Sequence, residues 1–375
     1  MRPHLCHVFP AFATGGPEVR TCLLINASTD AFRHTVVSLN GNLSGQSRIR
    51  QPQAVRFLEA PRNGSQVGNA IALARFLKEL EPDLVLTYGW GGTDGVLATR
   101  LCGIRRLIHT EDGFLPDEAL RQKFKRVLVR RVLLRMPVHV IVPSRTLLRI
   151  ATRSWWLPAR RIRYVPNGVD AARFAPPSPE RIAATRQRLG CTPAEVVVGT
   201  AGHLREEKNQ ERLVRAFAVL AARRPARLLL LGDGPLRESL DRLTRELGIA
   251  DRVVFTGIVN DTAEYYPAMD LFALSSDTEQ MPIAVLEAMG MALPVVSTAV
   301  GDVREMVSPE NRRFVTPRGN DPAYLAALTE LAEDAVARAA LGRANREKCL
   351  REYDVNTMIE AYLGLYREVL AKGRC

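Results

Sequence analysis

Short apolar runs alternate with amphipathic stretches along nearly all of the 375 residues, and this alternation limits the fold more than any other feature. A short continuous apolar run is typical of a strand buried on both sides, whereas apolar residues spaced three and four apart indicate a helix. Strands that alternate with helices form parallel sheets covered by helices on both faces. We therefore predict an α/β protein with doubly wound parallel sheets.

The apolar runs fall into two series, separated by a segment rich in Pro, Gly and Asn at 166–178. Such residues interrupt regular structure, and a domain averages roughly 150 residues. We predict an N-terminal domain at 1–168, a second domain at 169–350, and a C-terminal helix at 351–375 that packs back across the domains. The expected strands cover 5–9, 34–39, 54–58, 83–86, 106–109, 138–142 and 163–165, then 196–199, 227–231, 253–255, 271–274 and 294–297.

Two glycines follow the first expected strand, in Thr14-Gly15-Gly16-Pro17-Glu18. Glycine lets the backbone approach a ligand closely, and proline suits the first turn of a helix. The free amides of that turn would face an anion such as a diphosphate. A plain strand-to-helix turn explains the pattern equally well.

Three cationic or titrating side chains, His203, Arg205 and Lys208, lie between an expected strand and the next helix. This arrangement suits neutralisation of a diphosphate leaving group. A charged loop exposed to solvent is the alternative.

Two carboxylates eight residues apart bracket a helix start at Pro282. Glu279 lies in the loop before the helix, and Glu287 lies in its second turn. Both could accept hydrogen bonds from sugar or ribose hydroxyls, and the amides of Gln280, Met281 and Ile283 would add donors. The alternative is an ordinary helix start with one favourable and one surface carboxylate, but the apolar neighbours of Glu287 favour a functional role.

Together these motifs resemble the family 4 retaining glycosyltransferases of GT-B fold. The resemblance rests on Gly-x-Leu-x-x-x-Lys at 202–208, the turn at 231–236, Glu-x7-Glu at 279–287, Pro294-Val295-Val296, and the linker at 166–170 with Phe174. Each motif alone is weak, whereas the combination is specific. The resemblance implies two Rossmann-like domains that face each other across a cleft, with the N-terminal domain on the acceptor side.

The resemblance implies transfer of a sugar from a nucleotide-sugar donor, UDP before GDP, to a saccharide or lipid-linked acceptor in cell-surface polysaccharide or glycolipid synthesis. It places Gly16 at the donor phosphates and Glu287 at the ribose. The implied catalytic residues are His109, Lys208 and Glu279, and the implied donor-binding residues are Gly15, Gly16, His203, Arg205, Gln280, Met281, Pro282, Ile283 and Glu287. For His109, a core or capping histidine is an equal alternative.

Three positions depart from the family pattern. His203 stands where the family usually has Arg, and Gln280 and Asp302 each replace a usual Gly. These departures concern the choice of donor sugar more than the reaction. No Asp-x-Asp occurs in the chain, which is consistent with cationic side chains balancing the diphosphate, so we expect neither a metal nor a cofactor. A sugar-nucleotide epimerase of the same fold and a catalytically inactive basic binding protein remain alternatives.

The net charge of +12 is concentrated in one segment, because residues 100–163 hold 16 basic and 4 acidic residues. No nucleic-acid-binding motif accompanies the charge, so we expect no nucleic-acid partner. The stretch 119–136 instead reads as a basic amphipathic helix, with Leu120, Phe124, Val127, Leu128 and Leu134 able to share one side. Such a helix suits an anionic membrane, where each Lys or Arg contributes about 1 kcal/mol.

The alternative for this stretch is a surface helix whose apolar side packs on the sheet. In the neighbouring Trp155-Trp156-Leu157, core packing is favoured over a role as an interfacial anchor. Six unclustered cysteines, with no apolar stretch long enough for a signal peptide or membrane span, indicate a cytoplasmic protein, peripheral at most on the inner membrane face.

Overall fold

The computed structural model describes residues 2–13, 15–61, 66–114, 116–118, 122–136 and 138–372. Its contacts divide the chain into two units. Unit 1 comprises Met1–Asn167 and Asn356–Cys375, and unit 2 comprises Gly168–Val355. The sequence analysis placed the boundary one residue later and treated the tail as a separate segment. In the structure, the tail joins unit 1.

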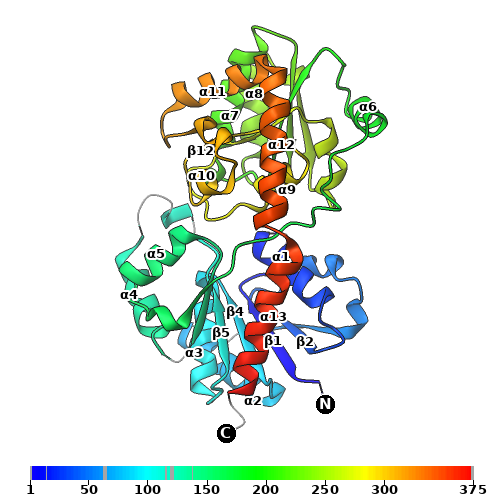
Figure 1. Ribbon diagram of the computed structural model, residues 1–375. Coiled ribbons are helices and arrows are strands. Elements are labelled where there is room, and N and C mark those ends of the chain that lie inside the picture. Colours follow the sequence, from blue (N-terminus) through cyan, green and yellow to red (C-terminus); the bar gives the residue numbers. More distant parts are fainter. Residues whose placement is uncertain are drawn as a thin grey trace. The chain divides into compact units, whose positions relative to one another are not determined.

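Unit 1 is built on a seven-stranded parallel sheet of order β3-β2-β1-β4-β5-β6-β7 (Figure 1). The strands are β1 (His4–Phe9), β2 (Arg33–Ser38), β3 (Val55–Glu59), β4 (Leu84–Tyr88), β5 (Leu107–Thr110), β6 (His139–Val142) and β7 (Ile162–Tyr164). The helices are α1 (Gly16–Asn26), α2 (Gln66–Leu80), α3 (Thr93–Leu101), α4 (Phe124–Leu133), α5 (Arg145–Arg153) and α13 (Val355–Ala371).

Unit 2 repeats this plan with a six-stranded parallel sheet of order β10-β9-β8-β11-β12-β13. The strands are β8 (Val196–Ala201), β9 (Ala226–Leu231), β10 (Val253–Gly257), β11 (Leu271–Leu274), β12 (Val295–Thr298) and β13 (Val315–Thr316). The helices are α6 (Pro179–Arg188), α7 (Gln210–Ala221), α8 (Arg237–Glu246), α9 (Ile283–Gly290), α10 (Val303–Met306), α11 (Asp321–Glu333) and α12 (Ala335–Glu352).

The continuous apolar runs of unit 2 are explained by burial of both sheet faces. Along β8, Val197 packs into one hydrophobic cluster, while its neighbours Val196 and Val198 pack into another. Successive side chains of a strand point to opposite faces, so a strand covered by helices on both sides has no polar face. The predicted fold class, two Rossmann-like α/β domains, is confirmed.

Every strand expected from the sequence is present, with bounds within two residues of those expected. The two-residue strand β13 was missed because it is too short to give a periodic pattern. The C-terminal segment also differs, since α12 continues to Glu352 and a separate helix, α13, starts at Val355. In the described part of the chain, every helix is too short or too polar to cross a membrane.

Histidines in the first two strands of unit 1 are structural. The Nε2 atom of His7 lies 3.0 Å from Nδ1 of His34, and its Nδ1 atom lies 2.8 Å from the Tyr88 hydroxyl. The Ser28 hydroxyl lies 3.1 Å from Nε2 of His34. Burial lowers the pKa of His34 to about 4, so its ring is neutral at pH 7. These rings fill the interior with satisfied hydrogen bonds and are not candidates for the site.

Candidate active site

In each sheet, the second and third strands of the unit lie on one side of its first strand, and the later strands lie on the other side. This reversal of strand order falls between β1 and β4 in unit 1 and between β8 and β11 in unit 2. Ligands of doubly wound sheets bind at such a switch point, beyond the carboxyl ends of the strands. In unit 2, these ends lead into the loops at 202–208 and 275–282, which hold most of the predicted site residues.

Lys208 and Glu279 meet where these two loops approach each other. The Lys208 Nζ lies 2.6 Å from Glu279 Oε1, and the Ser276 hydroxyl donates to the same oxygen at 2.9 Å. The lysine side chain is 27% exposed and the carboxylate 10%, so the pair lies at the surface but is shielded from bulk water. The structure thus brings together a cation and a carboxylate that are 71 residues apart in the chain.

Additional hydrogen bonds fasten the two loops to each other. The backbone amide of Asp277 donates to the carbonyl of Glu207 at 2.8 Å, and the Asn209 side chain donates to the Asp277 carboxylate at 2.9 Å. Arg212 donates to the other oxygen of Asp277 at 2.9 Å and to the carbonyl of Ser275 at 2.6 Å. The position of Lys208 relative to Glu279 is therefore set by backbone and side-chain contacts on both sides of the pair.

Gly301 supports the loop that carries Glu279. It has φ +52°, and a Cβ atom there would lie 2.6 Å from the carbonyl oxygen of Glu279 and closer still to that of Gln280. The next residue, Asp302, donates its amide to the Gln280 carbonyl at 2.9 Å. Asp302, one of the departures from the family pattern, thus makes a backbone contact that does not depend on its side chain.

We expect Gly301→Ala to lower the transfer rate at least about tenfold, because the new methyl group would displace the 279–280 backbone and with it the Glu279 carboxylate. Gly319→Ala is the matched control. Gly319 also has positive φ, +77°, but open space surrounds its Cβ position. Gly319→Ala should lose roughly 1 kcal/mol of stability to backbone strain, Gly301→Ala should lose more because its methyl group also meets backbone oxygens, and only Gly301→Ala should lose activity. Equal kcat/KM values for the two variants would contradict this role.

The second carboxylate, Glu287, accepts hydrogen bonds from two hydroxyls that the sequence analysis did not identify. The Tyr266 hydroxyl donates to Glu287 Oε2 at 3.0 Å, and the Thr262 hydroxyl donates to the same oxygen at 3.1 Å. Tyr266 is fully buried, and burial together with the Glu287 charge raises its pKa well above the ordinary value, so the phenol keeps its proton. The fixed orientation of Glu287 fits the predicted role as a hydrogen-bond acceptor.

The remaining predicted residues of unit 2 line the same loops. Gln280, Met281 and Pro282 are buried, and α9 begins at Ile283 with no side chain capping its N-terminus. His203 is partly buried, whereas Arg205 is exposed. An exposed guanidinium beside the Lys208 loop is accessible to an anionic ligand.

In unit 1, the predicted Gly15 and Gly16 stand at the start of α1. Gly15 is its N-cap, and no side chain caps the helix. Thr14 lies outside the described residues. Behind this turn, the buried Arg20 forms a 2.6 Å ion pair with Asp112 and a 3.0 Å hydrogen bond to Asn167. Arg20 therefore ties α1 to the segment after β5 and to the end of unit 1.

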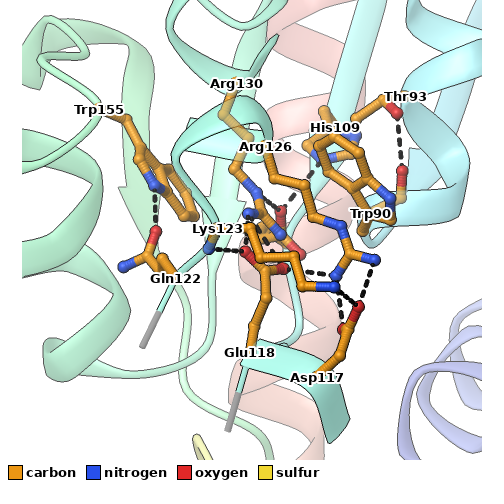
Figure 2. A network of polar contacts seen from close by, with 11 residues as sticks. Trp90, Thr93, His109, Asp117, Glu118, Gln122, Lys123, Arg126, Arg130 and Trp155 are labelled. Carbon is orange, nitrogen blue, oxygen red and sulfur yellow. Dashed lines mark hydrogen bonds and ion pairs between the residues drawn. The ribbon is translucent and has the colours of Figure 1, made fainter. Parts of the chain in front are cut away.

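The structure places His109 inside unit 1, as the core alternative expected. His109 lies within β5 and is fully buried. Its Nδ1 lies 2.8 Å from the Thr87 hydroxyl, and its Nε2 is 3.9 Å from the Glu111 carboxylate, which itself binds the buried Arg130 (Figure 2). The strand β5 extends one residue past His109, and the ring lies within the interior of the unit. A donor-contacting role for His109 stays a prediction.

The glycines at 89–95, which follow β4, have a packing role. A Cβ atom at Gly91 would collide with Pro10, and one at Gly95 would collide with Thr87 and Val8. These glycines let the β4–α3 turn pack closely on β1 and β4.

Several site-building residues gave no signal in the sequence. Thr262 and Tyr266 lie in short helical turns before β11, far from any motif, and Arg20 reads as one more charge on an amphipathic helix. Only Asn209 could have been found, because an asparagine before a helix suggests a cap, and its side chain does accept from the Arg212 amide.

Two family models match the chain. Residues 14–173 match the model described as Glycosyltransferase Family 4, and residues 195–334 match the one described as Glycosyl transferases group 1. Together they cover most of each unit. The chain belongs to the family 4 glycosyltransferases.

Similar proteins agree with this assignment. The chain is 30% identical, over 83% of its length and 81% of the relative's, to a GDP-mannose-dependent monoacylated alpha-(1-6)-phosphatidylinositol monomannoside mannosyltransferase of Corynebacterium glutamicum. It is 31% identical to the GDP-mannose-dependent alpha-(1-6)-phosphatidylinositol monomannoside mannosyltransferase of Mycolicibacterium smegmatis, over 72% and 73% of the two chains. The Anabaena HepE structure in complex with UDP and glucose has a similar fold, with TM-score 0.84, 21% identity and coverage of 97% and 99%.

Proposed function

We propose that the chain transfers a sugar, with retention of anomeric configuration, from a nucleotide-sugar donor to a saccharide or lipid-linked acceptor in cell-surface polysaccharide or glycolipid synthesis. The observation that carries this proposal is the Lys208–Glu279 pair, 2.6 Å apart at the switch point of the unit 2 sheet. A cation and a carboxylate at this position fit a donor that has an anionic diphosphate and a hydroxyl-rich sugar.

The chemistry requires charge stabilisation at two places. As the glycosidic bond to the diphosphate breaks, negative charge develops on the phosphate oxygens, and Lys208 and Arg205 would neutralise it. Positive character develops on the sugar, and its hydroxyls would be held by Glu279 and the 280–283 backbone amides. Retention follows if the acceptor attacks from the face that the diphosphate leaves and the leaving phosphate takes the acceptor proton. In this scheme, side-chain cations balance the diphosphate without a metal or other cofactor.

The donor and acceptor classes are supported by the relatives. Two relatives at 30% and 31% identity are named for GDP-mannose and for phosphatidylinositol mannoside acceptors. The sequence analysis ranked UDP-sugars first, and we therefore propose both nucleotide classes as donor candidates. A glycolipid acceptor would place the enzyme in the cytoplasm, at the inner face of the membrane.

A donor and acceptor screen tests the function. Purified protein is incubated with UDP-glucose, GDP-mannose and ADP-glucose in EDTA, with membrane lipid extract or saccharides as acceptor, and products are identified by mass spectrometry and their anomeric configuration by NMR. We expect a glycosylated product and release of nucleoside diphosphate from one donor. Conversion of the donor sugar into its epimer would instead support the epimerase alternative, and the absence of donor binding in thermal shift would remove the enzymatic proposal.

A further inference from the structure

The helix α4 buries one arginine and exposes three apolar residues, although Val127 and Leu133 pack against the core as in an ordinary surface helix. Phe124, Leu128 and Val132 are 74%, 48% and 55% exposed, whereas Arg130 on the opposite side is fully buried. At four-residue spacing, the three apolar side chains form a stripe along the solvent side of the helix. The sequence analysis expected Phe124 and Leu128 to share a side with Leu134, but Leu134 is buried; residues 119–121 of the expected helix lie outside the described residues.

The rotation of α4 is fixed by an ion-pair network on its inner side (Figure 2). The Arg130 Nε donates to Glu111 at 2.9 Å, and Nη1 lies 3.4 Å from Glu118. The Arg126 guanidinium binds Glu118 at 3.0 Å and Asp117 at 2.7 Å. The guanidinium of Arg130 also lies 4.9 Å from the Trp90 ring centre and 5.0 Å from that of Trp155. These contacts hold both arginines inward and thereby turn Phe124, Leu128 and Val132 outward.

The same network pairs the acidic residues at 111–118 that lie near α4 with basic side chains. Glu111, Asp117 and Glu118 are paired with Arg130, Arg126 and Lys123. On the outer side, Lys125 and Arg135 are exposed, and no carboxylate in the described ranges pairs with either of them. The outer side of α4 is therefore apolar and cationic, with no compensating acid.

An exposed tryptophan extends this surface. Trp156 is 57% exposed and has φ +55°, a strained conformation for a bulky residue. The Arg131 guanidinium of α4 lies 3.6 Å from its ring centre, and the Arg131 Nε donates to the carbonyl of Ser154 at 2.8 Å. Trp155 is buried instead, so core packing accounts for only one of the two tryptophans.

We propose that Phe124, Leu128, Val132, Trp156, Lys125, Arg131 and Arg135, here called the α4 outer surface, dock on an anionic lipid bilayer. Apolar side chains at helical spacing can enter the region between headgroups and acyl chains, tryptophan favours that interface, and the cations meet the lipid phosphates. A second copy of this chain is the less suitable occupant, because the cations of the two copies would face each other and repel. The surface lies on unit 1, and the proposal does not depend on the identity of the donor or acceptor.

Vesicle sedimentation of the full chain tests the docking. With vesicles of phosphatidylcholine alone or of phosphatidylcholine mixed with anionic phosphatidylglycerol, we expect binding only to the anionic vesicles and a decrease with salt. Intrinsic fluorescence should shift to shorter wavelength on binding, because Trp156 leaves water. Equal binding to both vesicle types, or no binding to either, would overturn the proposal.

Paired variants identify the surface. Phe124→Gln with Leu128→Gln should weaken partitioning at least about tenfold, since glutamine keeps the helix but removes the apolar contact. Ile258→Gln with Val336→Gln, which replaces two residues of unit 2 that are 72% and 81% exposed, should bind vesicles like the wild type. An equal loss in both pairs would contradict the assignment to α4.

A second comparison tests the charges. Lys125→Gln with Arg135→Gln should reduce binding and its salt dependence, whereas Arg223→Gln with Arg343→Gln, also exposed, should change neither. Donor-nucleotide binding by thermal shift should be unchanged in all four variants, so failure of docking and failure of the proposed activity are distinguishable. A concentration-dependent dimer in analytical ultracentrifugation that Phe124→Gln with Leu128→Gln dissociates would assign the surface to a second copy and refute the membrane proposal.

Discussion

Replacing Lys208 by alanine should lower the rate of sugar transfer by at least about 100-fold, the loss typical of removing one charge-stabilising group from an active site. The ammonium lies between the two loops at the switch point and is only 27% exposed, so water would replace it poorly as a counter-ion for the departing diphosphate. The measurement is kcat with saturating donor. Stability should change by no more than about 1 kcal/mol, because the pair is partly exposed.

Four further variants test this prediction. Lys208→Arg keeps the charge and should retain part of the activity, and Arg223→Ala removes an exposed unit 2 cation and should retain all of it. Glu279→Ala should also lose activity, and combining it with Lys208→Ala should cost less than the product of the two single effects, as for residues that act as a unit. Full activity in Lys208→Ala would refute the site.

Arg130→Met should destabilise unit 1 by about 3–5 kcal/mol, because it leaves the buried carboxylate of Glu111 without its arginine partner, whereas Glu118 keeps Arg126. In the native protein, burial by itself would raise the pKa of Glu111, but the Arg130 charge lowers it below the ordinary value. Without Arg130, burial alone raises that pKa. Because the variant can then take up a proton when folded, its deficit should be largest near pH 7.5 and should shrink as the pH falls toward 5.

Denaturant unfolding followed by tryptophan fluorescence measures this effect directly. The three tryptophans, Trp90, Trp155 and Trp156, all belong to unit 1, so the signal reports on that unit. Arg153→Met, which removes an exposed arginine from α5, is the control and should change stability by less than about 0.5 kcal/mol. Arg130→Lys should recover part of the loss. A pH-independent deficit would contradict the explanation by buried charge.

The strands and the loop motifs could be predicted because their signals are local. A strand buried on both faces must be apolar at consecutive positions, and the glycines, Lys208 and Glu279 stand at fixed places relative to strand ends. The contact between Lys208 and Glu279 could also have been predicted, since the ends of neighbouring parallel strands meet at one edge of the sheet. The hydrogen bonds from the Thr262 and Tyr266 hydroxyls to Glu287 could not be predicted, because both residues lie in short turns outside any motif.

Two side-chain orientations were decided only by tertiary structure. The sequence left open whether His109 is a core residue or a site residue, and the structure buries its ring within β5. The amphipathic pattern of α4 left open whether its apolar side would meet a membrane or the sheet. In the structure Phe124 and Leu128 are exposed, and Arg130 is buried on the inner side.

The sequence by itself determined the α/β architecture, the two-domain organisation, the family, and a basic segment at 100–163. Which side of α4 faces solvent depends on Glu111, Glu118, Trp90 and Trp155, which come from three other segments of unit 1. Periodicity within one helix carries no information about charges and rings that other segments bring to it. Pairing a buried guanidinium with two carboxylates and two aromatic faces outweighed the usual preference for burying leucine and phenylalanine, and so left an apolar, cationic surface exposed.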